Sequence, residues 1–570
     1  MKRKIMPFLL LIILLSLASC TPSPVPYIAQ ADPDFGRNIS QAQAQGQEPA
    51  LQEDGENDEI SYENMHTALA AGTANGHLRI SMSMPATLNP LLNSDPHVAQ
   101  VLRLIFEPLV ILDQNLRPIP NPAITQSIIF APDGRSLSVS LRENIYWEDG
   151  SAITSGDIAF SIDVLRFSAP ETAVYRKNVS NIASHSIIDS GSIQINLVSP
   201  VWSMKYMLNF PIIPANYYRP VSMTNLMAGR NMHPLGNGPF RFHSYELANH
   251  LELIANENAP GGVPGINRIT AVILRDIETS VHAFEQGVID ILVSNLGNSG
   301  RYAAMGKNRA AELPAGSFDF IGFNFNRSIF AYREIRAAIA HSLDLNAILQ
   351  RYYTLRDAAI APINPSSWLA AADLESYSFD IQRAVDLFNY VGFVPGPDGI
   401  LQRQLSEVLP VVQLSMTILV NEANAPGLST AHILSQGLTA SGVDSSVEAL
   451  PFEQFKARIQ ASDFDIMIGG FDLSPVPDFD FLHSENIGSA NIFGYSSEEL
   501  DLLLSMLNNA PSESAFYNSA IAVQHYIAEN LPFLGIGFHR QVLYTAQHIS
   551  GNIQVSYGHI FLNVQEWLVH

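Results

Sequence analysis

The sequence is poor in cysteine and lysine, and each shortage excludes a class of protein. Only one of its 570 residues is a cysteine, Cys20, so the chain cannot hold an internal disulfide or a metal centre of several thiolates. Only four lysines follow residue 4, and 54 Asp and Glu outnumber 31 Lys and Arg, for a formal charge of −23. Because nucleic-acid binding needs a dense basic surface, this balance excludes a general nucleic-acid binder.

Long apolar runs are also absent, and the longest stretch lies at the N-terminus. Residues 8–15 are all apolar and follow a basic head at 2–4, which is typical of an export signal. This run is too short to cross a bilayer, which takes roughly 20 apolar residues. The sequence then reads LASC at 17–20, which resembles a bacterial lipobox. We therefore expect residues 1–19 to be a lipoprotein signal peptide and Cys20 to be lipidated; the alternative is a buried thiol behind an ordinary signal.

Residues 20–75 have the composition of a tether. They are rich in Pro, Gln, Ala and Asn, and they carry nine carboxylates against Arg37 as the only arginine or lysine. Such a segment cannot bury enough apolar surface to offset its ordering entropy. We therefore expect a disordered acidic tether, with a soluble body beyond it, because no later run reaches 18 apolar residues.

From Gly76 onward, strand and helix patterns alternate in two blocks. The first block predicts strands at 271–275 and 288–292 around a helix at 278–286. The second predicts three strands separated by two helices, with the strands within 410–420, at 443–450 and at 464–469, and the helices at 428–440 and 452–461. Alternation of this kind favours parallel sheets, and the distance between the blocks indicates two α/β lobes.

Three further regions have recognisable patterns. Residues 318–326 alternate like a strand, and 332–350 predict one helix with an apolar stripe at four-residue spacing. Between 87 and 197, short strand-like runs surround one helix at 155–167, which indicates a third, smaller subdomain.

Several short motifs occur in an order that resembles one family. They are TLNPLL at 87–92, IFEPLV at 105–110, LRENIYWEDG at 141–150, ITSGD at 153–157, LGNGPFR at 235–241, FNFN at 323–326, REIRAA at 333–338 with LD at 343–344, and AVDLF at 384–388 with VGF at 391–393. Together they are similar to the family 5 extracellular solute-binding proteins, a group that includes oligopeptide-, dipeptide- and nickel-binding proteins of ABC importers. The resemblance runs from about residue 77 to the C-terminus, with Asn237 and Phe240 as departures from the family's Gly-Thr-Gly-Pro-Tyr turn.

The resemblance implies an α/β fold, namely a bilobed clamshell of the type II periplasmic-binding-protein class with an extra small subdomain. Lobe I would comprise 76–112, 205–312 and 540–570, the extra subdomain 113–204, and lobe II 313–539. It also implies a monomeric receptor, lipid-anchored outside the cytoplasm, that captures a peptide or similar small solute and delivers it to an ABC permease and its ATPase. No catalysis and no cofactor are expected.

A ligand site is expected at the carboxyl end of the 464–469 strand, because crevices of α/β sheets form there. Gly469 and Gly470 would let a ligand backbone approach closely, or would simply bend the strand. In oligopeptide binders an aspartate that receives the ligand's α-ammonium group stands where this chain has Ser474, so Asp472 or Asp478 would have to replace it. The candidate ligand-binding residues are Gly469, Gly470, Phe471, Asp472, Ser474, Asn324, Asn326, Trp368 and Asn491.

Two alternatives remain open at this stage. A secreted, lipid-anchored hydrolase is one, although the sequence lacks the His-Glu-x-x-His, Gly-x-Ser-x-Gly and Ser-x-x-Lys motifs. A dispersed Ser/His/Asp arrangement would escape such a motif search. The other alternative, within the same fold, is a nickel- or haem-binding receptor, although the sixteen histidines show no compact ligand spacing.

Overall fold

The computed structural model describes residues 76–219, 224–227, 229–294, 299–352, 356–404 and 410–570. The predicted signal peptide, the predicted tether and Cys20 lie outside these residues. Within the described ranges, no helix combines the length and the apolar character that crossing a membrane requires.

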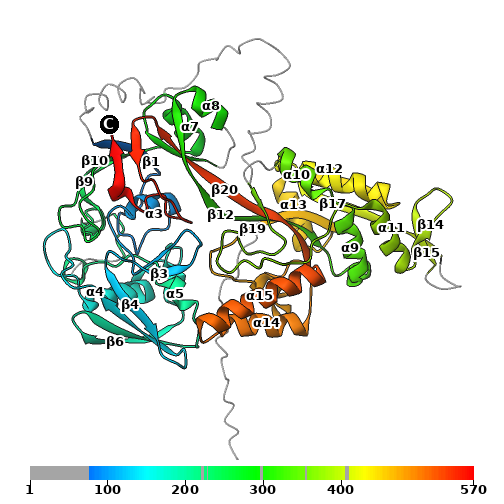
Figure 1. Cartoon of the computed structure of the whole chain (residues 1–570), viewed down its shortest axis with the longest axis horizontal. Coiled ribbons are helices and arrows are strands. Elements are labelled where there is room, and N and C mark those ends of the chain that lie inside the picture. Colours follow the sequence, from blue (N-terminus) through cyan, green and yellow to red (C-terminus); the bar gives the residue numbers. More distant parts are fainter. Residues whose placement is uncertain (1–75, 220–223, 228, 295–298, 353–355, 405–409) are drawn as a thin grey trace, which may run out of the picture.

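The first half of the molecule is built on two four-stranded sheets (Figure 1). One sheet has the order β1 (His77–Met82), β10 (Arg268–Ile273), β9 (His250–Ala255) and β8 (Phe240–Glu246), and only its β1–β10 pair is parallel. The other is antiparallel, with the order β4 (Thr125–Phe130), β5 (Ser136–Leu141), β7 (Ser192–Leu197) and β6 (Ile182–Asp189). Both sheets, α3 (Pro96–Leu102) and α4 (Ser155–Asp163) contribute to one apolar core. The predicted helix at 155–167 is thus α4, followed by a π-helical turn at Val164–Ser168.

One predicted parallel pair is wrong. The strands expected at 271–275 and 288–292 correspond to β10 and β11 (Ile291–Ser294), with α7 (Ile277–Glu285) between them. They belong to different sheets, because β10 pairs with β1 and β9 while β11 pairs antiparallel with β20 (Phe533–Ala546). A local pattern indicates which segments are strands but not which distant strand offers the better partner.

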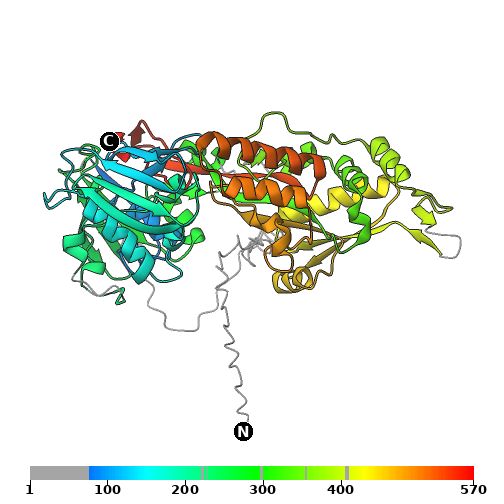
Figure 2. The same cartoon turned by 90° about the horizontal axis from the view of Figure 1, so that it is seen from below.

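The second predicted block is confirmed. The strands β17 (Ser415–Asn421), β18 (Asp444–Leu450) and β19 (Ile466–Asp472) alternate with α12 (Ala425–Ala440) and α13 (Phe452–Gln460). β17 lies in the middle and runs parallel to both of its neighbours. We call the described residues within 313–539, which include these elements, the second half, and those within 76–312 and 540–570 the first half. Figure 2 shows the two halves side by side, seen from below.

The helix predicted at 332–350 is two helices, α9 (Arg333–His341) and α10 (Leu345–Tyr352). The Oγ atom of Ser342 donates to the carbonyl of Ala338 at the end of α9, and the carboxylate of Asp344 accepts a hydrogen bond from the Ala347 amide. Asp344 therefore starts a new helix where the apolar spacing alone suggested continuation.

Two long antiparallel strands, β12 (Lys307–Phe323) and β20, run from one half to the other (Figure 1). Their register shifts at three places, between Arg309 and Ala311, between Pro314 and Phe318, and between Asp319 and Phe320. β12 also pairs with β19. The strand predicted at 318–326 is the last part of β12, which begins at Lys307 and ends at Phe323. Irregular pairing of this kind lets a strand pair bend.

The remaining α-helices and strands complete the two halves. They are β2 (Val110–Leu112), β3 (Pro118–Pro120), β13 (Arg356–Ala358), β14 (Val394–Pro395), β15 (Leu401–Gln404), β16 (Val411–Gln413), β21 (Ile549–Gly551), β22 (Trp567–Val569), α5 (Met204–Met207), α6 (Ala215–Tyr218), α8 (Ser299–Ala304), α11 (Ile381–Tyr390), α14 (Glu498–Asn508) and α15 (Glu513–Asn530).

The LGNGPFR motif packs backbone against backbone inside the first half. The Gly238 amide donates to the Ile105 carbonyl at 2.7 Å, and the Phe240 amide donates to the Leu104 carbonyl at 2.9 Å. A Cβ atom at Gly236 would lie 2.0 Å from the Ile105 oxygen. Glycine is therefore required here by the approach of two chain segments.

Glu148 is bound to the same motif and makes stability depend on pH. Its carboxylate accepts a hydrogen bond from the Gly236 amide at 3.1 Å, and burial raises the pKa of Glu148 to about 7 from 4.5. Because the folded state binds this proton more tightly, the contribution is complete below about pH 4.5 and is lost as the pH rises through about 7.

We expect the free energy of unfolding of Glu148→Gln, relative to that of the wild type, to increase by about 2 kcal/mol when the pH is raised from about 5 to about 8. Glutamine keeps an oxygen for the Gly236 amide but carries no charge. Urea unfolding at the two pH values measures the change, with the exposed neighbour substitution Glu143→Gln as the control. A stability difference that is the same at both pH values would contradict the assignment.

Candidate functional site

A small cavity lies where the sequence placed the ligand site, at the carboxyl end of β19. It measures about 20 Å³ and is enclosed by both halves. Its lining residues are Leu116, Ala315, Gly316, Pro362, Ile363, Asn364, Ser367, Leu473, Ser474, Pro475, Pro477, Phe538 and Tyr557. Ser474 is thus the one predicted residue that lines this cavity directly.

A larger cavity of about 330 Å³ is lined by neighbouring positions of the same segments. Its walls are Gln114, residues 311–314, Ser366, Arg540 and residues 553–556. We call the two cavities together the hinge cleft, because β12 and β20 contribute to both. Arg540 is fixed in its wall by ion pairs with Asp357 and Glu312.

Gly316 makes room at the centre of the hinge cleft. A Cβ atom there would lie 2.3 Å from the Leu473 oxygen, 2.5 Å from the Tyr557 hydroxyl and 2.7 Å from Oδ1 of Asp472. The Tyr557 hydroxyl donates to the Leu473 carbonyl at 3.0 Å, and the Leu473 amide donates to the Gly316 carbonyl at 2.9 Å. A side chain at 316 is therefore incompatible with this arrangement.

Asp472 is a carboxylate without a neutralising contact. It is exposed to solvent, and within the described parts of the chain its side chain forms neither an ion pair nor a hydrogen bond. Its side chain is exposed but stands over a buried strand, and the partial loss of hydration there raises its pKa, while the charge of His539 acts in the opposite direction. His539 itself lies 3.3 Å from Asp319. A carboxylate in this setting favours the binding of a cationic ligand group.

β19 also offers a strand edge next to Asp472. On one side, β12 pairs with the strand throughout, from Ile466 to Asp472. On the other side, the ladder with β17 includes only Ile466 and Met467. Among the described residues, the second edge beyond Met467 therefore has no partner strand; residues 468–471 of this edge are buried and Asp472 is exposed. Strand addition by an extended ligand uses an unpaired edge of this kind.

Two of the predicted contacts in this strand are core residues. Phe471 is fully buried, with its ring stacked on Phe320 at a centroid distance of 4.6 Å and packed against Phe481 at 4.3 Å. Gly469 is buried, and a Cβ atom there would lie 2.7 Å from the Met467 methyl group. Both positions serve packing. Gly470 is also buried, and it pairs with Asp319 of β12.

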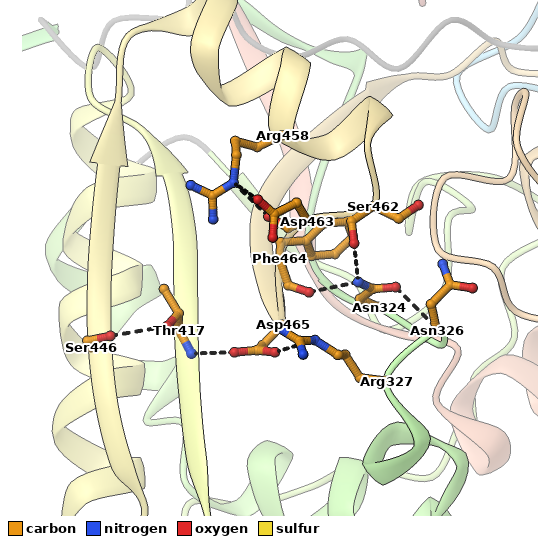
Figure 3. Close-up of polar contacts among 10 residues, drawn as sticks. All are labelled: Asn324, Asn326, Arg327, Thr417, Ser446, Arg458, Ser462, Asp463, Phe464 and Asp465. Carbon is orange, nitrogen blue, oxygen red and sulfur yellow. Dashed lines mark hydrogen bonds and ion pairs between the residues drawn. The ribbon is translucent and has the colours of Figure 1, made fainter.

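Asn324 and Asn326 do not face the hinge cleft as expected. β12 and β19 are antiparallel, so Asn324 lies at the amino end of β19, opposite to the end where Asp472 lies. Figure 3 shows the side-chain amide nitrogen of Asn324 donating to the carbonyls of Ser462 at 2.8 Å and Phe464 at 2.7 Å. The side-chain oxygen of Asn324 accepts a hydrogen bond from the backbone N–H of Asn326. Asn324 is fully buried and ties β12 to the start of β19.

Asn491 and Trp368 also make contacts within the protein. The Asn491 side chain is buried, donates to the carbonyls of Tyr495 and His483, and accepts from the Gly494 amide. Trp368 lies where the two halves meet and donates from Nε1 to the hydroxyl of Tyr206. The nine predicted residues are therefore not brought together at one site.

Gly316, Tyr557 and His539 were not predicted from the sequence. A signal for Gly316 was present, because a glycine inside a strand often marks a close backbone approach. Nothing local marked Tyr557, which reaches the cleft from the C-terminal segment, or His539. In the described ranges, no three His, Cys, Asp or Glu side chains are grouped to hold a metal ion.

The comparisons with known proteins agree on a family. The model of the bacterial extracellular solute-binding proteins, family 5, matches residues 120–491. A putative ABC transporter peptide-binding protein of Brucella ovis is 26% identical over 333 residues, which is 57% of this chain and 62% of the relative. The oligopeptide-binding protein AppA of Bacillus subtilis is 21% identical over 476 residues, covering 80% of this chain and 84% of that protein.

A solved structure shows the same fold. The ABC transporter substrate-binding protein CtaP of Listeria monocytogenes superimposes with a TM-score of 0.71 at 18% identity, covering 87% of this chain and all of that one. The expected α/β fold of the type II periplasmic-binding-protein class is thereby confirmed. The matched family model covers well over half of the sequence, so this chain belongs to the family 5 bacterial extracellular solute-binding proteins.

Proposed function

We propose that this protein is the solute-binding receptor of an ABC importer and that it captures a peptide or similar small solute in the hinge cleft. The observation that carries the proposal is the pairing of an unneutralised carboxylate, Asp472, with a free strand edge at the carboxyl end of β19. Together these features suit an extended ligand that begins with a cationic group. The peptide-binding relatives support the same reading.

In this proposal the two halves are lobes that close on the ligand. Lobe I takes in 76–112, 205–312 and 540–570, with 113–204 as the extra subdomain, and lobe II takes in 313–539. The irregular register between Pro314 and Phe318 lies next to the cavities and provides the place where β12 and β20 bend. The closed form then presents its surface to the permease and the ATPase, and no covalent chemistry is required.

The ligand's α-ammonium group would pair with Asp472. A cation there offsets the desolvation that raises the pKa of Asp472, so the pair gains a charge-assisted contact and relieves an existing cost. Ser474, at the position of the family's usual aspartate, lines the cavity beside it. Asp478, the other replacement expected from the sequence, has an exposed side chain that accepts a hydrogen bond from the Asp480 backbone amide, and loss of hydration and the charge of Asp480 raise its pKa to about 6.

Membership of an extracellular solute-binding family supports a location outside the cytoplasm. We propose that Cys20 is lipidated and anchors the protein to a membrane, with residues 20–75 as the tether and a monomeric body. Fractionation of cells that produce Cys20→Ser tests the anchor. Persistent, equally firm membrane association of the mature variant would rule it out.

We expect short peptides with a free N-terminus to raise the melting temperature of the wild type. A ligand at about 100 times its Kd adds about 2.7 kcal/mol to the free energy of unfolding. Loss of the charge in Asp472→Asn should weaken binding by about tenfold or more, because one charge-assisted contact is removed. Calorimetric titration with peptides of random sequence, from three to five residues, measures both effects.

Two matched controls sharpen this experiment. Asp444→Asn removes an exposed carboxylate on β18, away from the hinge cleft, and should bind like the wild type. N-acetylated versions of the same peptides lack the cation and should bind the wild type as weakly as free peptides bind the variant. Equal binding of free and acetylated peptides would refute the role of Asp472, and recovery of cleaved peptides would favour a hydrolase.

A further inference from the structure

The two halves also touch at a place apart from the paired strands β12 and β20 and from the hinge cleft. Trp202, just before α5, and Tyr206, within it, belong to the first half and meet Trp368 and Phe516 of the second half. The Trp202 ring lies 5.3 Å from Phe516 and 5.7 Å from Trp368, between ring centroids. We call these four side chains the aromatic clasp. Figure 1 shows α5 next to the helices α14 and α15.

Three hydrogen bonds of clasp residues also join the two halves. Nε1 of Trp368 donates to the hydroxyl of Tyr206 at 2.8 Å, and the Trp368 amide donates to the carbonyl of Asn115 at 2.8 Å. The Trp202 amide donates to the carbonyl of Ala510 at 2.8 Å. Each of these bonds joins the first half to the second half, so each must break if the halves separate.

An ion pair lies at the rim of the clasp. Arg117 of the first half pairs with Glu513 of the second half, and its guanidinium carbon lies 5.0 Å above the Trp368 ring. The side chains of Arg117 and Glu513 are 45% and 40% exposed, whereas Trp202 and Tyr206 are buried. The contact thus has a dry aromatic centre and a charged, wet rim, as a reversible interface between rigid bodies does.

We propose that the aromatic clasp is a protein-made lock for the closed form, separate from any ligand contact. The chain passes between the halves along β12 and returns along β20, so a bend of these strands would separate the clasp residues of one half from those of the other. Its contacts exist only when the halves are together, and they therefore bias the equilibrium between open and closed forms. The inference rests on the proposed closing of the lobes.

The clasp also gives Trp368 a different role from the ligand contact expected from the sequence. A residue that stabilises closure changes apparent affinity through the closed fraction, for every ligand alike. A residue that touches the ligand changes affinity according to the ligand's chemistry. Weakening the clasp should therefore reduce the affinities for different peptides by one common factor.

Tryptophan fluorescence of the full chain can measure the clasp without any ligand. The chain has four tryptophans, of which Trp147 and Trp567 are 1% and 0% exposed, while the other two belong to the clasp. Opening should expose Trp202 and Trp368 to acrylamide. We expect the double variant Arg117→Ala/Tyr206→Phe, which keeps all four tryptophans, to raise the open-to-closed ratio about tenfold and to increase quenching.

The matched control removes an equivalent ion pair and hydroxyl that act within the halves. In Arg458→Ala/Tyr217→Phe, the arginine partners Glu448 and Asp463 of the second half, and the tyrosine donates to His233 of the first half. This control should leave quenching at the wild-type level. Glu513→Ala, at an exposed position, should move quenching in the same direction as the clasp variant.

Unchanged quenching in both the clasp variant and Glu513→Ala would overturn the proposal, as would an equal increase in the control. Increased quenching with native melting behaviour supports it. Because the measurement uses no peptide, its outcome is independent of the proposed ligand. A clasp that responds while no peptide binds the wild type would refute the peptide assignment and leave the lock intact.

Discussion

Gly236→Ala is expected to lower the free energy of unfolding by about 3 kcal/mol, among the largest stability effects that a single methyl group can cause here. The new Cβ atom would lie 2.0 Å from the Ile105 carbonyl oxygen and 2.7 Å from its Cγ2 atom. The nearest atom is a backbone oxygen, which cannot move out of the way by changing rotamer as a flexible side chain can. The two segments would have to separate and lose the hydrogen bond from Gly238 to Ile105.

Urea unfolding followed by circular dichroism measures this loss. Gly191→Ala is the matched control, because the nearest atom to its Cβ position is Oδ1 of Asp189 at 3.7 Å, an ordinary contact distance. Neither glycine has a positive φ angle, so neither substitution strains the backbone by itself. A Gly236→Ala protein as stable as the control would show that residues 105 and 236 are not held this closely.

The elements of the second half could be predicted because their signals are local. The strands predicted at 443–450 and 464–469 correspond to β18 and β19, and α12, which precedes β18, ends where Ser441 and Gly442 follow. Partner choice is not local. β10 was predicted to pair with the next strand along the chain, yet β1, from nearly two hundred residues earlier, takes that edge.

The candidate site was predicted in part for a related reason. The rule that crevices form at the carboxyl ends of parallel strands led to Asp472 and Ser474. The same rule cannot tell a side chain that lines the cleft from one that faces the core, and Phe471 and Asn324 proved to be buried. A buried polar residue such as Asn324 satisfies backbone carbonyls, and a single sequence shows the residue without showing its partners.

Tyr557 illustrates a different limit. It approaches Gly316 and Leu473 from a C-terminal segment that is distant in sequence, so its role follows from tertiary packing alone. Its hydroxyl occupies the space that glycine leaves open. A side chain at position 316 would fill that space and should therefore weaken ligand binding more than a substitution of any of the predicted polar residues.

Gly316→Ala is expected to abolish the peptide-induced rise in melting temperature, with affinity reduced by about a hundredfold, which corresponds to roughly 2.7 kcal/mol. The added Cβ atom would lie 2.3 Å from the Leu473 oxygen and 2.5 Å from the Tyr557 hydroxyl. Relief of these contacts requires Tyr557 to release its 3.0 Å hydrogen bond and the chain after Asp472 to move. The carboxylate, the strand edge and the cavity wall are then displaced together.

The matched control for this substitution is Gly156→Ala at the start of α4, where the nearest atom is the Thr154 hydroxyl at 3.3 Å. Calorimetric titration of both variants with one peptide, at a temperature where both are folded, separates binding from stability. Gly316 also has no positive φ angle, so alanine there changes volume without forcing a new backbone conformation. Wild-type affinity in Gly316→Ala would place the ligand outside the hinge cleft, because the substitution displaces residues next to Asp472 and would weaken any ligand bound there.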